Sequence, residues 1–429
     1  MNKQVLKSKI LNETCYKYMI ENGLSLFVLP KKEQRSNYAI FGTKFGSVHT
    51  DFIDDCSNEY HMPNGIAHFL EHKLFESEEQ DAFERFTKTG ASSNAYTSFD
   101  RTCYLFSCTE NFYDSYDILL DFVQSPYFTE ETVKKEQGII GQEIKMYDDM
   151  GSWQVYMNAL RALYHNIPVN VDIAGTVDEI GKITAEDLFA CYNAFYNPSN
   201  MFICICGNVD ADEVYSFTQK RLRSRNFIKA KSVFLDEPDD VCKELIVTQA
   251  VISIPQFIVA FKNKVNKGQF ISLKDRIVRS MLFDIIASKR SRLYTELLND
   301  NLINSEFGAE VFEGPGYCSC MFMGESIDPH LVKDRICDEI KAIKNNGIDP
   351  AAFEISKRQM YGNFVKQFDS VDSVVAHMVD AAVSNYNFFD YFEVLNSVTI
   401  EDLKIQINEA FNEDKMNLSV IEPISKSEG

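Results

Sequence analysis

The sequence predicts an α+β protein of two similar halves, each a mainly antiparallel sheet with helices packed on one face. Three observations support this prediction. A segment around residue 195 recurs around residue 410, apolar strand-like runs precede long helical segments, and each repeated segment reads as a helix followed by a strand.

Length and composition limit the class of protein. The chain has 429 residues, more than one ordinary domain of ~100–200 residues holds. Hydrophobic residues make up 45% of it, enough for packed cores in a globular protein. The net charge of −20 repels phosphate backbones, so we expect no nucleic-acid partner. The acidity either steers cationic substrates inward or only maintains solubility.

The cysteines and the N-terminus indicate a compartment. The 11 cysteines form no repeated CxxC pattern, and unpaired thiols are typical of a reducing environment. The N-terminal residues contain no continuous apolar stretch of the secretory kind. No run of ~18 apolar residues is present, so we expect no membrane span. These features together favour the cytoplasm.

The strands and helices can be predicted in order along the chain. Residues 24–30 and 38–44 read as a strand pair separated by a polar stretch. Residues 64–76 read as a helix capped by Asn64, and 131–150 have the apolar spacing of a long helix. Residues 95–106 alternate as one strand does. A helix is expected to begin at Thr184, followed by a buried strand over 202–206 that ends at Gly207.

An internal repeat suggests duplication. Residues 183–206 resemble residues 398–421 at an offset of 215, with Thr184, Asp187 and Leu188 recurring as Thr399, Asp402 and Leu403. Residues 139–148 resemble 360–369 at an offset of 221. Either match alone could be a chance likeness of two amphipathic helices. Two matches at nearly equal offsets favour a duplicated unit of about 215 residues.

The domain boundary is predicted from composition. Residues 220–231 are rich in lysine and arginine, and residues 236–240 are acidic and contain a proline. Such stretches are typical of exposed linkers. We therefore expect a first domain over 1–220, a linker over 221–241 and a homologous second domain over 242–429.

The helix at 64–76 carries a possible metal motif. His68 and His72 are four residues apart, so their side chains share one helix face and can reach a single zinc ion. Glu71 neighbours that face without being a ligand. Zinc lowers the pKa of its bound water, and a carboxylate at this position can accept the water's proton. The alternative is three polar residues on a solvated helix face, although few chains with seven histidines contain this pattern by chance.

A third ligand is needed for a tetrahedral site with one open position. Glu136 and Glu143 are seven residues apart on the predicted helix at 131–150, so they share one face two turns apart. One could be a ligand and the other could support it. Spacing alone leaves open that both face solvent.

These motifs resemble the insulinase/pitrilysin family of zinc peptidases, which have the inverted motif His-x-x-Glu-His. The likeness extends over nearly the whole chain. It includes residues 68–72, the pair Glu136 and Glu143, the stretches 90–97 and 102–104, and the segments 175–176 and 196–201. A closer likeness is to the zinc-bearing subunit of two-subunit peptidases from Gram-positive bacteria.

The resemblance implies a role for each residue. One Zn²⁺ per chain would be held by His68, His72 and Glu143. Glu71 would be the general base, and Glu136 would support the site. The resemblance also implies that a strand containing Asn94 and Ala95 binds the substrate. An added peptide strand gains backbone hydrogen bonds there.

The implied activity is that of an endopeptidase which cleaves short or unfolded peptides, bound as an added β-strand in a closed chamber. The alternative is a non-catalytic scaffold subunit of a peptidase complex. The enzyme is favoured because a scaffold has no reason to retain the full set of His68, Glu71, His72 and Glu143.

The second half departs from the pattern of active members. By the offset of 215, the positions that correspond to residues 68–72 are residues 283–287, which contain no histidine. An Arg and a Tyr seven residues apart are expected downstream, but those positions hold Leu297 and Asn304, and Arg292 and Tyr294 have the wrong spacing. We therefore expect a heterodimer in which a homologous subunit supplies this pair, with a homodimer as the alternative.

Overall fold

The computed structural model describes residues 2–78, 80–223 and 228–424. The chain forms two compact units, and neither is one continuous stretch of sequence. Unit 1 contains residues 1–142, 172–233 and 364–390, and unit 2 contains 143–171, 234–363 and 391–429. The expected ranges, 1–220 and 242–429, therefore differ from the units in two segments that are exchanged between the halves of the sequence.

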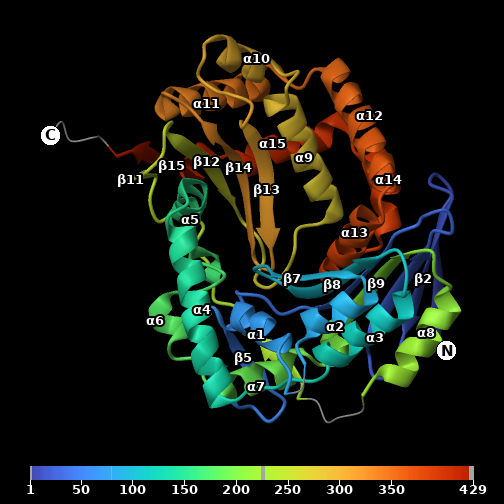
Figure 1. The fold of residues 1–429 in the computed structure, drawn as a ribbon. Coiled ribbons are helices and arrows are strands. Elements are labelled where there is room, and N and C mark those ends of the chain that lie inside the picture. Colours follow the sequence, from blue (N-terminus) through green and yellow to red (C-terminus); the bar gives the residue numbers. More distant parts are fainter. Residues whose placement is uncertain (1, 79, 224–227, 425–429) are drawn as a thin grey trace. The chain divides into compact units, whose positions relative to one another are not determined.

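Unit 1 is built on a seven-stranded sheet (Figure 1). Its strand order is β1 (Asn2–Ser8), β2 (Glu13–Met19), β3 (Ser25–Pro30), β9 (Met201–Gly207), β4 (Asn37–Thr43), β8 (Thr102–Cys108) and β7 (Ser92–Thr97). Only the β3–β9 pair is parallel. A small second sheet contains β10 (Ala230–Ser232), β5 (Asp51–Asp54) and β6 (Glu59–His61).

The predicted strand at 202–206 is confirmed as β9, which is buried along its whole length. The prediction that the strands at 24–30 and 38–44, now β3 and β4, pair with each other is wrong. β9 lies between β3 and β4 and is hydrogen-bonded to both. Since β9 comes from more than 150 residues later in the chain, local sequence could not show this insertion.

The prediction of one strand over 95–106 is also wrong. The chain forms a hairpin there, in which β7 and β8 pair from Ser92 with Ser107 to Thr97 with Thr102. The turn covers residues 98–101 and contains neither glycine nor proline. Its turn-forming residues, Ser98 and Asp100, are a weaker sequence signal than glycine or proline.

Helices cover both faces of the large sheet. Helix α3 (Phe112–Val123) contacts β4 and β8, and α8 (Ala211–Arg221) contacts β3. Helix α13 (Val371–Ser384) covers the other face by contacting β4 and β9 (Figure 1). The other helices of this unit are α1 (Ile66–Leu74), α2 (Ala82–Thr89), α6 (Val177–Ile180) and α7 (Ala185–Phe195).

Unit 2 repeats the central part of this sheet. Its order is β11 (Leu245–Ala250), β15 (Met416–Pro423), β12 (Gln256–Asn263), β14 (Tyr317–Glu325) and β13 (Gly308–Gly314). The β11–β15 pair is parallel and the other pairs are antiparallel. This matches β3, β9, β4, β8 and β7 of unit 1 strand for strand, so the predicted α+β fold with two similar halves is confirmed. The prediction that helices pack on only one face of each sheet is wrong for unit 1, since α13 covers the face opposite α3.

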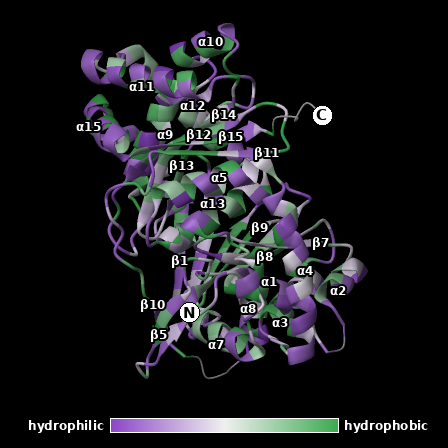
Figure 2. Ribbon diagram, turned by 90° about the vertical axis from the view of Figure 1, so that its left-hand side faces the viewer, coloured by the Kyte–Doolittle hydropathy of each residue, from purple (hydrophilic) through white to green (hydrophobic). Residues whose placement is uncertain are grey.

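The helices of unit 2 complete the repeat. They are α5 (Gly151–Leu163), α9 (Leu273–Ala287), α10 (Arg292–Asn299), α11 (Pro329–Asn346), α12 (Pro350–Gln367), α14 (Tyr391–Ser397) and α15 (Ile400–Ala410). Apolar residues from α9, α11 and α15 pack with β12 and β14 in one core. Figure 2 shows hydrophobic residues concentrated in the central strands of each unit, whereas the helices also carry hydrophilic residues.

Two equivalent helices are exchanged. Helix α5 follows the first half's long helix, α4 (Glu130–Asp148), yet it packs on β12 and β15 of unit 2. Its counterpart α13 follows α12 and packs on β4 and β9 of unit 1. The chain changes unit inside α4 after Gln142 and inside α12 after Asn363, positions 221 residues apart. The duplication read from the sequence thus extends to the crossing points.

Helix ends also follow the repeat. Thr184 and Thr399 each begin a helix with a capping box, closed by Asp187 and Asp402. The prediction that Asn64 caps α1 is wrong. Gly65 occupies that position at φ 88°, and the Asn64 side chain donates instead to Glu179 Oε1 at 2.5 Å.

The predicted linker range contains ordered residues. Strand β10 pairs with β5, and Glu237 accepts hydrogen bonds from Lys262 Nζ and from the backbone of residues 165–167. Residues 224–227 of that range lie outside the described part of the chain.

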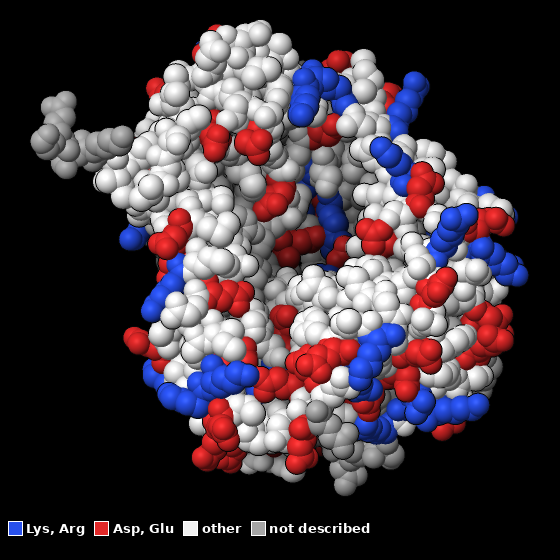
Figure 3. All heavy atoms as spheres, viewed as in Figure 1, with Lys and Arg blue, Asp and Glu red and all other residues white. Residues whose placement is uncertain are grey.

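The surface and the thiols agree with the composition. Acidic and basic side chains are interspersed over the face seen in Figure 3. All 11 cysteines are free, and most are buried. Within the described ranges, no helix combines the length and apolar character needed to cross a membrane.

Candidate metal centre

The histidine motif lies on α1, and packing fixes that helix. Ile66, Phe69, Leu70 and Leu74 are buried on its inner side. At its start, a Cβ on Gly65 would lie 2.4 Å from the Ala174 carbonyl oxygen. Only glycine fits this left-handed, close-packed position. The segment before α6 therefore determines where the metal-site helix begins.

The three predicted ligands come together. A nitrogen of His68, a nitrogen of His72 and a carboxylate oxygen of Glu143 all lie within 4.8 Å of one another. Glu143 lies on α4, one residue past the point where the chain changes unit, and the helix is unbroken there. Small side-chain rotations can bring each of these atoms to within ~2.0–2.2 Å of a shared zinc ion, the ligand distance that zinc requires.

The donor set fits zinc. Two imidazoles and one carboxylate are a known ligand set of catalytic zinc sites, in which a fourth position stays open. Within the described residues, one other group of potential ligand atoms lies this close together, namely Asp54, Asp55 and Cys56. Asp54 already accepts hydrogen bonds from the backbone of Cys56 and Asn58, which accounts for that loop without a metal.

Glu136 contacts one of the predicted ligands. Its Oε1 lies 2.9 Å from His72 Nδ1, and the carboxylate is buried. Burial alone would raise the pKa of Glu136, but the hydrogen bond to His72 and nearby positive charges lower it overall. The carboxylate is therefore ionised and accepts the Nδ1 proton, which holds the His72 ring in the tautomer whose Nε2 can bind a metal.

Glu71 lies beside the ligands in a buried position. Thr97 Oγ1, at the end of β7, donates a 2.6 Å hydrogen bond to Glu71 Oε2. Beneath it, the hydroxyls of Tyr104 and Tyr196 lie 2.8 Å apart. Burial, with the negative charge of Glu71 as a further cause, raises the pKa of both tyrosines well above its usual range. Both tyrosines therefore stay neutral.

His68 is neutral as well. Burial, and then repulsion from His72, lowers the pKa of His68 to about 3. A neutral imidazole is the form that binds a metal ion. His68 is thus in the protonation state that a metal ligand needs at neutral pH.

Asn94 and Ala95 lie on β7, the last strand of the sheet order. In the described structure β7 pairs with β8 on one side only, and exposed and half-buried side chains alternate along it. Asn94 is exposed, and its Oδ1 accepts from the Ala95 amide at 2.9 Å. The outer edge of this strand can therefore accept an extended peptide.

In unit 2 the residues at and near the expected Arg/Tyr positions make contacts within the fold. Tyr294 and Leu297 are buried in its core. Arg292 pairs with Glu339, and Asn304 Nδ2 donates to Glu325 Oε2 at 2.7 Å. Each side chain thus has a structural partner in its own unit.

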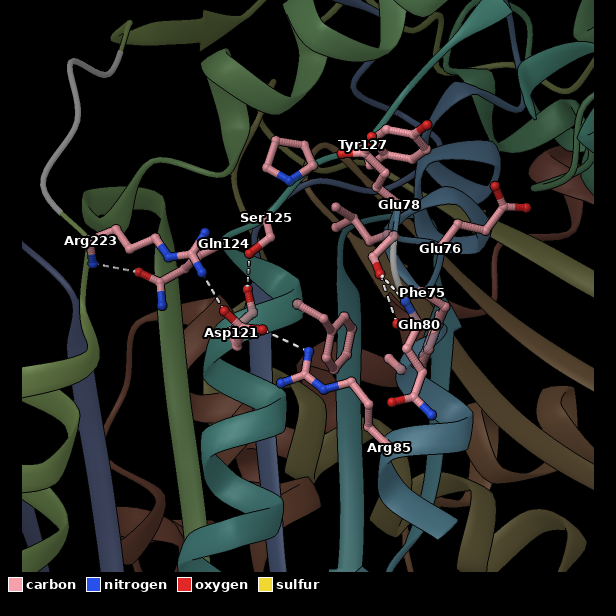
Figure 4. A pocket seen from close by; sticks show the side chains of 15 residues that line it. Phe75, Glu76, Glu78, Gln80, Arg85, Asp121, Gln124, Ser125, Tyr127 and Arg223 are labelled. Carbon is pink, nitrogen blue, oxygen red and sulfur yellow. Dashed lines mark hydrogen bonds and ion pairs between the residues drawn. The ribbon is translucent and has the colours of Figure 1, made fainter. Parts of the chain in front are cut away.

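A cavity of about 690 Å³ opens at the C-terminal end of α1, away from the histidines. Figure 4 shows Arg85 and Arg223 converging on Asp121 in its wall. The Gln124 side chain accepts from the Arg223 backbone amide. Because Arg85 and Arg223 both pair with Asp121, we infer that these contacts hold α2 and residue 223 against α3.

Sequence reasoning assigned no role to Thr97. In the structure Thr97 shares a strand face with Ala95 and Ser93, and all three are half-buried. What the sequence could not show is that this face meets α1.

Comparisons with known proteins agree with this geometry. Residues 57–177 match the model of the insulinase family (peptidase family M16), and residues 182–360 match that of the peptidase M16 inactive domain. The chain is 36% identical to YmfH of Bacillus subtilis, named an uncharacterized zinc protease, over 97% of this chain and 98% of that protein.

Solved structures give the same result. An M16-like peptidase from Alicyclobacillus acidocaldarius superimposes with a TM-score of 0.93 at 33% identity, covering 98% of this chain and 100% of that one. A protease from Helicobacter pylori shares the fold, with a TM-score of 0.81 at 20% identity over 95% and 99% of the two chains. The chain belongs to the insulinase family of zinc-protease-like proteins, peptidase family M16.

Proposed function

We propose that this protein is a zinc-dependent endopeptidase that cleaves short or unfolded peptides. The observation that carries the proposal is the convergence of His68, His72 and Glu143, with the buried Glu71 beside them. A scaffold protein has no use for three metal ligands and an adjacent buried carboxylate.

When bound, zinc would lower the pKa of a coordinated water towards ~7 and polarise a peptide carbonyl. The chain's own residues perform the remaining work. Glu71 accepts the proton of the attacking water and delivers it to the leaving amine. Glu136 holds the proton on His72 Nδ1, which keeps that ring oriented towards the ion.

The substrate is proposed to bind along β7. A peptide added to this edge gains backbone hydrogen bonds next to Asn94 and Ala95, with little demand on its side chains. Such binding favours extended, unfolded chains because a folded protein rarely offers a free strand. The free cysteines support the cytoplasm as the place of action, where thiols stay reduced.

A homologous subunit is proposed to complete the site. Since Tyr294 is buried and Arg292 is paired with Glu339, neither serves as an oxyanion donor or substrate clamp. Loss of one oxyanion donor costs about 3–4 kcal/mol of barrier. We therefore favour a heterodimer whose partner supplies an Arg and a Tyr, over a homodimer of this chain.

The test compares the chain alone and mixed with candidate homologous subunits. Metal content is measured by elemental analysis, and cleavage is followed with quenched fluorescent peptides. Glu71→Gln should keep one zinc per chain and lower kcat by ~100-fold or more, because the base is lost and the ligands remain. Glu84→Gln, an exposed glutamate on α2, serves as the control.

Unchanged turnover in Glu71→Gln would exclude the proposed mechanism. Full activity of the isolated chain would exclude the need for a partner. A chain that binds zinc and cleaves nothing, alone or mixed, would instead fit the alternative of a scaffold subunit.

A further inference from the structure

The hydroxyl of Thr97 is the contact between the candidate base and the strand proposed to bind substrate. Thr97 Oγ1 lies 2.6 Å from Glu71 Oε2. Thr97 is the last residue of β7, and Thr102 lies opposite it on β8. The hydroxyl of Thr102 in turn donates to the Phe45 carbonyl oxygen at 2.8 Å.

The protons of these two hydroxyls have a fixed direction. The Thr97 and Thr102 oxygens lie 3.4 Å apart, and each hydroxyl carries one proton. The Thr102 proton is committed to Phe45. The Thr97 proton is therefore available for the Glu71 carboxylate, which accepts and cannot donate while ionised.

Burial makes this hydrogen bond matter. Glu71 is 8% exposed, so its carboxylate is largely removed from water, and a buried charge needs hydrogen-bonding partners. Hydrogen bonds to charged groups are stronger than those between neutral groups. By holding Oε2, Thr97 fixes the plane of the carboxylate and so the direction in which Oε1 points.

We propose that Thr97 is a positioning residue for the base Glu71, so that the strand that holds the peptide also sets the orientation of the group that activates the attack on it. The proposal rests on the peptidase function proposed above. It assigns to Thr97 an effect on turnover, separate from substrate binding by the β7 edge and separate from metal binding.

The first test is kinetic. Thr97→Val keeps the shape of the side chain and removes the hydroxyl, whereas Thr97→Ser keeps the hydroxyl. Thr97→Val should lower kcat by ~10- to 100-fold, the effect of losing one hydrogen bond to a charged group, with KM and zinc content unchanged. Thr97→Ser should restore most of kcat. Thr14→Val, at a half-buried position on β2 of the same sheet, is the matched control and should behave as wild type.

The second test does not depend on turnover. Crystal structures of the zinc-loaded wild-type and Thr97→Val proteins should show one Glu71 rotamer in the former and several in the latter. If the wild type is active, an unaffected kcat in Thr97→Val would overturn this inference, and so would a single Glu71 rotamer in that variant. Either result would leave the proposed function standing. A rise in KM at unchanged kcat would assign Thr97 to the strand and also overturn it. An inert wild type, with and without partner, would overturn the proposed function together with this inference.

Discussion

His72 Nδ1 and Glu136 Oε1 lie 2.9 Å apart, and this contact ties the metal-motif helix α1 to α4. A nitrogen of His72 also lies within 4.8 Å of a carboxylate oxygen of Glu143, which is two turns further along α4 than Glu136. In the proposed metal site, the same helix would therefore supply one ligand and the group that orients another.

This contact predicts the effect of changing Glu136. Glu136→Ala should weaken zinc binding by ~10- to 100-fold, because the His72 ring loses the acceptor that fixes its tautomer. Glu136→Gln should have a smaller effect, since the amide oxygen still accepts the proton. Competition with a chromogenic chelator measures both. Equal affinity in all three proteins would show that the ion is held elsewhere.

His49 predicts a pH dependence of stability. Burial lowers the pKa of His49 from 6.5 to about 4, and its Nδ1 accepts the Gly46 amide proton at 3.0 Å. Between these pH values the unfolded chain binds more protons than the folded one, so stability falls as pH falls from about 6.5 to 4. The full contribution, of about 3 kcal/mol, is present above pH 6.5.

Urea unfolding at pH 7 and pH 5 measures this effect. Between pH 7 and pH 5, the free energy of unfolding of the wild type should fall by about 2 kcal/mol more than that of His49→Gln. The glutamine oxygen can accept the Gly46 amide proton and does not titrate. Parallel pH profiles of the two proteins would refute the assignment.

The contact between Asp380 and Arg101 predicts a link between α13 and the β7–β8 hairpin. Arg101, in the β7–β8 turn, donates to Asp380 Oδ1 at 2.5 Å and to both oxygens of Asp100. Asp380→Ala should destabilise unit 1 by ~1 kcal/mol, since Asp380 is half-exposed and Asp100 still pairs with Arg101. Hydrogen exchange should rise in the amides of the hairpin. Asp380→Asn, which keeps the acceptor, is the matched comparison.

Local features were the predictable part of this protein. The helix that carries both histidines and the helix that begins after Thr184 depend on residues close together in sequence, and both helices form as expected. The start of α1 was predicted correctly, but its cap was not, because Gly65 is required by a contact with Ala174 that is distant in sequence.

Pairings between distant segments were not predictable. Nothing in residues 24–44 indicates that β9 enters between β3 and β4, since an apolar strand pairs equally well with several neighbours. The hairpin of β7 and β8 was missed because its turn contains neither glycine nor proline, and Ser98 and Asp100 give a weaker turn signal. The hydrogen bond from Thr97 to Glu71 depends on that hairpin, so it could not be inferred either.

The exchange of α5 and α13 bears on how the molecule can be divided. Each sheet receives one of its covering helices from the other half of the gene. Two fragments separated at the midpoint of the chain would each expose an apolar sheet surface to water and would carry an orphan helix.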